Sequence, residues 1–133
     1  MTPKEAKAYL LQYRESIIRA RETTVHLNEL KAEAVQLHDH EGNSVLLDKA
    51  VARYVDACDD AADYLELLDE RRKEIEATID AVQSEHLQTL LREIYINGKK
   101  IVRVAADRDQ SYEHICRLHG AALLAVCEVL RKE

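Results

Sequence analysis

Apolar residues recur every three or four positions through most of this 133-residue chain, which is the spacing of a buried helix face. From Pro3 to about residue 40, no helix breaker interrupts the pattern. Its apolar or small positions are Leu10, Tyr13, Ile17, Ala20, Thr24, Leu27, Ala34 and Leu37. The alternation of three and four predicts one long helix with a heptad seam that Lys31 interrupts.

A second pattern of the same kind follows a polar turn. Residues 39–44 read Asp-His-Glu-Gly-Asn-Ser, and Ser44 is a candidate N-cap of the next helix. The seam predicted for that helix is Leu47, Val51, Tyr54, Cys58, Ala61, Leu65, Leu68, Arg72, Ile75, Ile79 and Val82. A short turn makes the two helices antiparallel neighbours, each about 50 Å long at about 1.5 Å per residue. Residues 1–83 are therefore predicted to form a long, coiled-coil-like helical hairpin.

Some apolar residues of this hairpin lie outside both predicted seams. They are Val25, Leu30, Val35, Val55 and Leu67. They widen the apolar stripes and leave a face that a second chain could cover, so a homodimer through the hairpin is expected. The alternative is a monomer whose hairpin folds back on the C-terminal helices.

Residues 84–133 predict a separate module of three short helices, over residues 87–98, 99–107 and from 111 onward. Gly98 after Asn97 is a stop signal suited to a left-handed cap, and Ser111 is a candidate N-cap. The inward positions are Leu87, Leu90, Leu91, Ile94, Ile101, Val104, Ala105, Ile115, Leu118, His119, Ala122, Leu123 and Val126. This spacing predicts a tri-helical helix-turn-helix module in an all-α protein.

Composition and charge agree with long helices and add an asymmetry. Charged residues make up 33% of the chain, with one Pro, three Gly and neither Phe nor Trp. The net charge is -6, yet residues 98–126 carry five Lys or Arg against three Asp or Glu. Such asymmetry fits a nucleic-acid module on an acidic stalk. No apolar run of about 18 residues predicts a membrane span, and the N-terminus lacks the apolar core of a signal peptide, so a cytoplasmic protein is expected.

The side chains that carry chemistry are few. Cys58, Cys116 and Cys127 have no CxxC spacing and are expected to be reduced thiols. Cys116 and His119 could share a helix face as metal ligands, but no second pair completes a tetrahedral site. With no Gly-rich phosphate loop and no nucleophile–base pair, neither an enzyme nor a metal or other cofactor is expected.

The last helix instead predicts a DNA-facing surface. The candidate DNA-binding residues are Lys99, Lys100, Arg103, Arg108, Ser111, Tyr112, His114 and Arg117. The first four of these would lie near phosphates. Arg117 is the expected base reader, because Arg to guanine is the commonest specific contact; its alternative is an ordinary surface residue. For Tyr112 the helical wheel slightly favours core packing.

Two motifs extend this prediction by resemblance. The run Tyr95-Ile-Asn-Gly-Lys99, followed by Arg117-Leu-His-Gly-Ala-Ala-Leu123, resembles small phage- and prophage-encoded proteins of bacteria. These place a sigma-factor region-four-like helix-turn-helix after a long helical segment, and some are regarded as activators of phage late transcription. The resemblance covers most of the chain. It implies a transcription regulator in the bacterial cytoplasm, with promoter or operator DNA, and RNA polymerase, as partners.

The chain departs from that family pattern at four positions. Ile101 stands where an aromatic is usual, Arg108 where an apolar residue is usual, Asp109 where Gly is usual, and Ala121 where a basic residue is common. An unpaired Arg108 aimed at the core would cost several kcal/mol, so either the helix ends near Asp107 or Arg108 reaches outward. Asp109 tolerates a left-handed turn better than most residues. The alternative function is a non-enzymatic coiled-coil interaction protein whose degenerate helix-turn-helix does not bind DNA.

Overall fold

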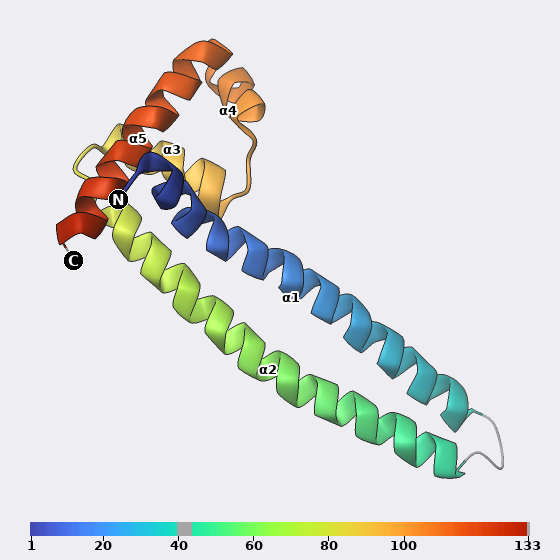
Figure 1. Cartoon of the computed structure of the whole chain (residues 1–133). Coiled ribbons are helices and arrows are strands. Elements are labelled where there is room, and N and C mark those ends of the chain that lie inside the picture. Colours follow the sequence, from blue (N-terminus) through green and yellow to red (C-terminus); the bar gives the residue numbers. More distant parts are fainter. Residues whose placement is uncertain (40–43, 133) are drawn as a thin grey trace. The chain divides into compact units, whose positions relative to one another are not determined.

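The computed structural model describes residues 1–39 and 44–132 (Figure 1). The described residues contain helices and no strand, so the all-α prediction is confirmed. The elements are α1 (Pro3–His38), α2 (Ser44–Asp80), α3 (Glu85–Leu91), the π-helical turn η1 (Arg92–Ile96), α4 (Ile101–Arg108) and α5 (Tyr112–Lys132). Residues 40–43 of the predicted turn lie outside the described residues, and α2 begins at Ser44.

The chain divides into two compact units. Unit 1 comprises Met1–Glu15 and Glu70–Glu133, and unit 2 comprises Ser16–Asp69. Both units therefore contain parts of α1 and α2, whereas the sequence pattern predicts a division between residues 83 and 84. The reason lies in burial: Leu10 and Ile79 are completely buried, so the apolar ends of the two long helices belong to the core of unit 1.

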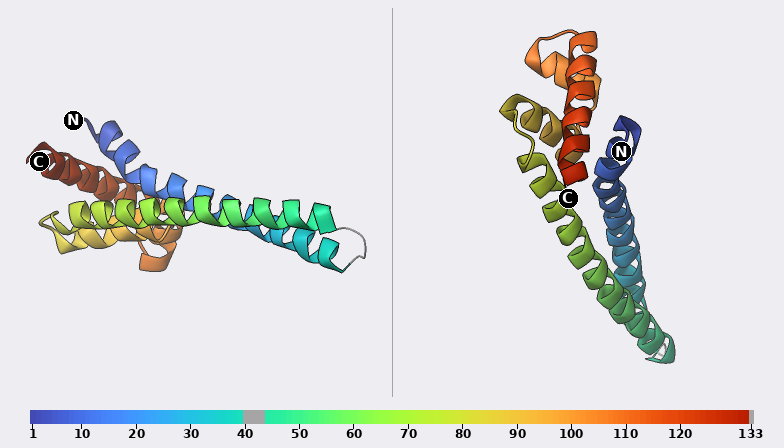
Figure 2. Two further views of the ribbon diagram at one scale, coloured as in Figure 1. Left: turned by 90° about the horizontal axis from the view of Figure 1, so that it is seen from below. Right: turned by 60° about the vertical axis from the view of Figure 1, so that its left-hand side comes forward.

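In unit 2 the two long helices run antiparallel, side by side (Figure 2). The hydroxyl of Tyr64 donates to the backbone carbonyl of Ser16 at 3.0 Å. Further along, the guanidinium of Arg53 lies 2.7 Å from a carboxylate oxygen of Glu33. These two contacts show which parts of α1 and α2 lie opposite each other along the helices.

The seam of α2 in unit 2 differs in part from the prediction. One heptad column is confirmed, because Leu47, Tyr54, Ala61 and Leu68 are buried or half-buried. The other column is shifted by one residue: Ala50 and Tyr64 take the inward positions predicted for Val51 and Leu65, which are exposed. The larger apolar residues misled the prediction. A small Ala allows close helix approach, and Tyr64 gains a hydrogen bond to the facing helix.

The seam of α1 also differs from the prediction by one residue at two positions. Leu30 is half-buried and Lys31 is exposed, so Leu30 is a seam residue and Lys31 is not an interruption. Similarly, Thr23 is half-buried, whereas Thr24, the predicted seam residue, is exposed. The heptad pattern of α1 is therefore more regular than predicted, because the apolar Leu30 takes the seam position that was predicted for Lys31.

Unit 1 is built around the C-terminal helices. Ser84 caps α3, its Oγ accepting a hydrogen bond from the amide of Leu87 at 3.4 Å. The predicted inward residues Leu90, Leu91 and Ile115 are completely buried. The π-helical turn that follows α3 also turns Tyr95 inward, beyond the predicted face.

Polar contacts fasten the end of α2 to the helix that follows. The side-chain amide of Gln88 donates to the carbonyl of Asp80 at 3.2 Å, and the Arg92 guanidinium pairs with the Asp80 carboxylate. On the N-terminal side, the hydroxyls of Tyr9 and Thr78 lie 3.0 Å apart and join α1 to α2 within unit 1. Across residues 1–39 and 44–132, no helix has the length and apolar character that crossing a bilayer requires.

Candidate nucleic-acid interface

Helices α4 and α5 are joined by a tight turn. Asp109 adopts the left-handed conformation, with φ 54° and ψ 45°, and ends α4. Its amide donates to the carbonyl of Ala106 at 3.2 Å, and the amide of Gln110 donates to that of Ala105 at 3.0 Å. Gly98, before α4, is also left-handed at φ 73°. The conformations expected for Gly98 and Asp109 are confirmed.

The first turn of α5 is capped as predicted. The Oγ of Ser111 accepts a hydrogen bond from the amide of His114 at 3.1 Å. Tyr112 is about half exposed, so the core packing that the helical wheel slightly favoured is wrong. A hydrogen bond with the thiol of Cys116, one turn later, raises the pKa of the Tyr112 phenol. The Tyr112 ring is therefore available at the beginning of α5.

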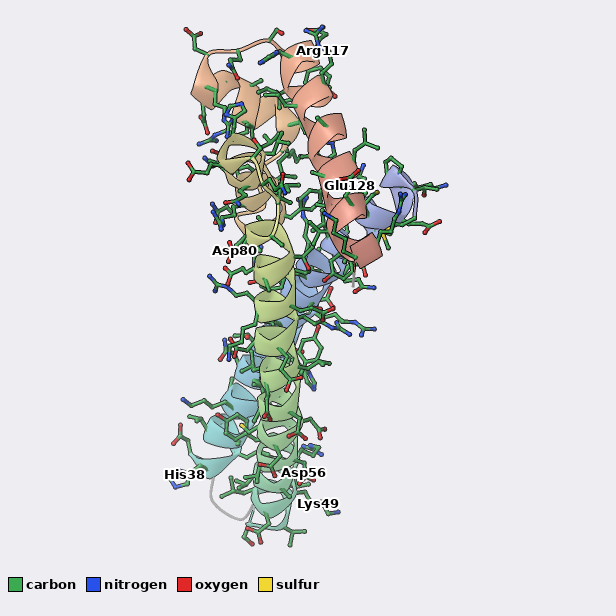
Figure 3. All side chains as sticks on the ribbon, turned by 90° about the vertical axis from the view of Figure 1, so that its left-hand side faces the viewer. His38, Lys49, Asp56, Asp80, Arg117 and Glu128 are labelled. Carbon is green, nitrogen blue, oxygen red and sulfur yellow. The ribbon has the colours of Figure 1, made fainter. Side chains whose placement is uncertain are left out.

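The outward side of α5 carries Arg117. Its side chain is exposed and forms no ion pair within the described residues, and His114 beside it is half-buried. A Cβ placed on Gly120 would meet no atom within 4 Å, so this side of the helix is open. Figure 3 labels Arg117 near the beginning of α5 and Glu128 nearer its end. Arg117 thus lies in the half of α5 that follows the turn.

Three predicted phosphate contacts gather around the beginning of α4. Lys99, Lys100 and Arg103 line a shallow hollow together with Gly98, Val102 and Ala106. Lys100 is exposed and has no ion-pair partner among residues 1–39 and 44–132. Asp107 neutralises part of the remaining charge, because its carboxylate lies 3.2 Å from Lys99 Nζ and 3.5 Å from Arg103 Nε. Lys100 is therefore the least compensated of the three cations.

The backbone at this end of α4 adds to the positive potential. Lys100 is the N-cap, and no side chain caps the first turn, which contains no acidic residue. The first amide groups of a helix lack intrahelical acceptors and carry partial positive charge, which favours an anion nearby. The hollow at residues 98–106 therefore combines cationic side chains with uncapped amides.

Arg108 lies apart from these cations. Its guanidinium is 3.1 Å from Glu93 Oε1 on η1, and the two side chains are only 17% and 20% exposed. The helix ends near Asp107 as the first alternative predicted, since Arg108 is its last residue and Asp109 its cap. The second alternative is wrong, because the charge of Arg108 is paired with Glu93 and does not reach outward. Because an inward arginine requires a facing acid, Glu93 was the residue that sequence reasoning missed.

A second internal pair was also missed. The hydroxyl of Tyr95 lies 2.6 Å from Nε2 of His119, with the two rings stacked 5.8 Å apart. Burial raises the pKa of Tyr95 to about 12. Burial, followed by the charge of Lys7, lowers the pKa of His119. His119 is therefore neutral near pH 7, and its tautomer sets whether Nε2 or the Tyr95 hydroxyl donates in this hydrogen bond. His119 at a predicted inward position was the signal available in the sequence, whereas Tyr95 is turned inward by the π-helical turn.

This hydrogen bond also bears on the suggested metal ligands. The ring nitrogen Nε2 of His119 is engaged by Tyr95, and Cys116 is half-buried on the same helix. Within the part of the chain that the structure describes, no three His, Cys, Asp or Glu side chains are grouped to hold a metal ion.

No family model, curated protein or solved structure matches the chain. The resemblance carried by residues 95–99 and 117–123 therefore rests on those motifs alone.

Proposed function

We propose that the chain is a DNA-binding transcription regulator of phage or prophage type, with α4, the turn at Asp109 and α5 acting as a helix-turn-helix. The observation that carries the proposal is the pairing of a capped, outward-facing α5 bearing an unpaired Arg117 with cations gathered at the beginning of α4. The residues at the turn, 109–111, are as short a connection as that motif uses.

In this proposal the first turns of α5 enter the major groove. Arg117 donates to the O6 and N7 acceptors of a guanine, and His114 and Tyr112 contact neighbouring positions. Lys99, Lys100 and Arg103 contact phosphates and set the orientation of α5, together with the uncapped amides of α4. Ser111 acts through the backbone, since its hydroxyl caps the helix. Arg108 stabilises the module through Glu93 and makes no DNA contact.

Charge sets the expected strength of binding. Each phosphate neutralised contributes a slope of about -0.9 to the dependence of log K on log salt, so Lys99, Lys100 and Arg103 together predict about -2.7 per copy. Asp107 reduces the magnitude of this slope, because its carboxylate already pairs with Lys99 and Arg103. The net charge of -6 further opposes non-specific association. We therefore expect weak binding at physiological salt and clear binding at low salt.

The experiment is a fluorescence-anisotropy titration of a mixed-sequence duplex pool at two salt concentrations. Lys100→Ala should weaken binding to all sequences and reduce the salt slope by about 0.9. Lys49→Ala, an exposed lysine of unit 2, is the matched control and should change neither quantity. Arg117→Ala should lower discrimination among selected sequences by about 1–3 kcal/mol while the salt slope changes little.

A second candidate is a non-enzymatic interaction protein. It is favoured by the observation that Asp107 compensates two cations and that Arg108 is internal. A folded protein that binds no duplex at low salt would support this candidate and reject the DNA-binding proposal.

Two partners belong to the proposal as well. Exposed apolar residues of unit 2, among them Val25, Val35 and Val55, favour a homodimer through the two long helices. The resemblance suggests contact with bacterial RNA polymerase, for which we assign no residue.

A further inference from the structure

One face of unit 2 has a second heptad-spaced stripe beside the seam. On α2 it consists of Val51, Val55, Cys58, Ala62 and Leu65, in steps of four, three, four and three. Val51, Val55 and Leu65 are 44%, 50% and 54% exposed. Apolar residues at this spacing pack against another helix and not against an irregular peptide, because only a helix presents matching holes at each turn.

The same face includes a stripe of α1. In an antiparallel pair, residues that follow the seam by one position lie on the same side of both helices. On α1 these residues are Ile17, Arg21, Thr24, Asn28, Lys31 and Val35. We call the two stripes together the flank face. The opposite face is closed by the ion pair between Arg53 and Glu33 and is mostly charged.

We infer that a second copy of the chain covers the flank face, with α1 of one copy against α2 of the other. Charge carries this choice. The α1 stripe contains Arg21 and Lys31 and no acid, with Glu22 and Glu29 along its rim. Asp48 extends the α2 stripe, and the α2 rim is predominantly acidic: it carries Asp56, Asp59, Asp63 and Glu66 beside Lys49. Arg21, Lys31, Asp48 and Asp59 form no ion pair within residues 1–39 and 44–132. Their complementary charges are therefore available to a facing copy.

The charges also select the two-fold axis. An axis parallel to the helices sets α1 against α2 of the second copy, so Arg21 and Lys31 face acids. An axis across the helices sets α1 against α1 and α2 against α2, which brings like charges together; when it crosses at the level of Cys58, that thiol lies beside its own copy. The first arrangement avoids this repulsion.

Steric fit at one level of the helices supports the same arrangement. Residue numbers fall along α1 as they rise along α2, so the Tyr64–Ser16 and Arg53–Glu33 contacts place Leu65 at the level of residues 15–21 of α1, and a parallel axis brings Leu65 of one copy to that level of the other. At that level α1 is hollowed, and the hollow is lined by Ile17, Ala20, Arg21, Thr24 and Val25. The first four occupy positions i, i+3, i+4 and i+7, the hole that receives a knob in helix packing. Leu65 is the knob.

This inference rests on the proposed homodimer and is independent of DNA binding. The flank face offers fewer residues than the roughly 20–30 per side of a standard interface. We therefore expect the homodimer to have a dissociation constant of about 1–100 µM.

Sedimentation equilibrium of the full chain over about 5–500 µM tests the face. Wild type should dimerise, and Leu65→Asp should weaken the dimer at least about 10-fold. Leu67→Asp is the matched control, because Leu67 is exposed on the opposite side of the same helix. A monomeric wild type would reject the homodimer altogether. An unaltered Leu65→Asp dimer would reject the flank face while leaving the homodimer intact.

Charge reversal tests the arrangement. Arg21→Glu/Lys31→Glu and Asp48→Lys/Asp59→Lys should each be monomeric alone, and an equimolar mixture should form the heterodimer. Failure of the mixture to associate, with both proteins helical by circular dichroism, would overturn the inference. Efficient formation of a Cys58–Cys58 disulfide in a Cys116→Ser/Cys127→Ser variant would also overturn the inference. That disulfide requires the two-fold axis that runs across the helices. Duplex titration of Leu65→Asp reports separately on DNA binding.

Discussion

The ion pair of Arg108 and Glu93 allows the sharpest test of how unit 1 is held together. Removing one partner of a fully buried pair costs about 3–5 kcal/mol, and removing one partner of an exposed pair costs about 0–1 kcal/mol. The two side chains are 17% and 20% exposed, so this pair lies between the limits. We expect Arg108→Met to lower the free energy of unfolding by about 2 kcal/mol, because it leaves the Glu93 carboxylate without its cation.

A double-mutant cycle separates the pair from the rest of the core. Glu93→Met should destabilise unit 1 by a similar amount, and the double variant should lie within about 1 kcal/mol of wild type, since two apolar side chains can replace the pair. Urea unfolding followed by circular dichroism at pH 7 measures all four proteins. Arg103→Met is the matched control, because its contact with Asp107 is largely exposed and should contribute under about 1 kcal/mol. If the double variant lost the sum of the single losses, the pair would not be coupled and the reasoning would fail.

Other predictions concern pH, packing and the turn. The pKa of His119 is lowered from 6.5 in the fold, so the unfolded chain binds the extra proton below that pH. Stability should therefore be full above about pH 7.5 and fall as the pH drops below about 6.5, by at most about 1.4 kcal/mol per unit; urea midpoints of His119→Gln should lack this component. Ile115→Ala should cost about 2–5 kcal/mol in the same assay, because Ile115 is completely buried, whereas Leu124→Ala should change little. Asp109→Gly should stabilise by about 0.5–1 kcal/mol by relieving the left-handed conformation, and an unchanged melting temperature would contradict that.

Local signals in the chain predicted much of unit 1. A serine before an apolar-periodic segment predicted the cap of α5 at Ser111, and Gly98 predicted the left-handed stop. Both depend on groups within a few residues of each other, which is why sequence alone reveals them. The candidate cations Lys99, Lys100 and Arg103 were found together for the same reason, since one helix start places them around one hollow.

The residues that sequence reasoning missed depend on partners distant along the chain. Nothing near Arg108 identifies Glu93, and nothing near His119 identifies Tyr95. The seam of α2 shows the same limit, because Val51 and Ala50 are equally compatible with a local period. Only the facing helix decides between them.

The amino-acid sequence by itself determined that this protein is helical, approximately where its helices begin and end, and which side chains can carry a positive surface. Helical period, caps and breakers act within one or two turns, so they can be read without a partner. The tertiary structure decided which stripe of each long helix is buried, that Arg108 is internal, and that an apolar stripe from Val51 to Leu65 is left facing solvent. Those outcomes depend on close packing and charge pairing between segments that meet only in the fold, and their energies have no counterpart in the isolated chain.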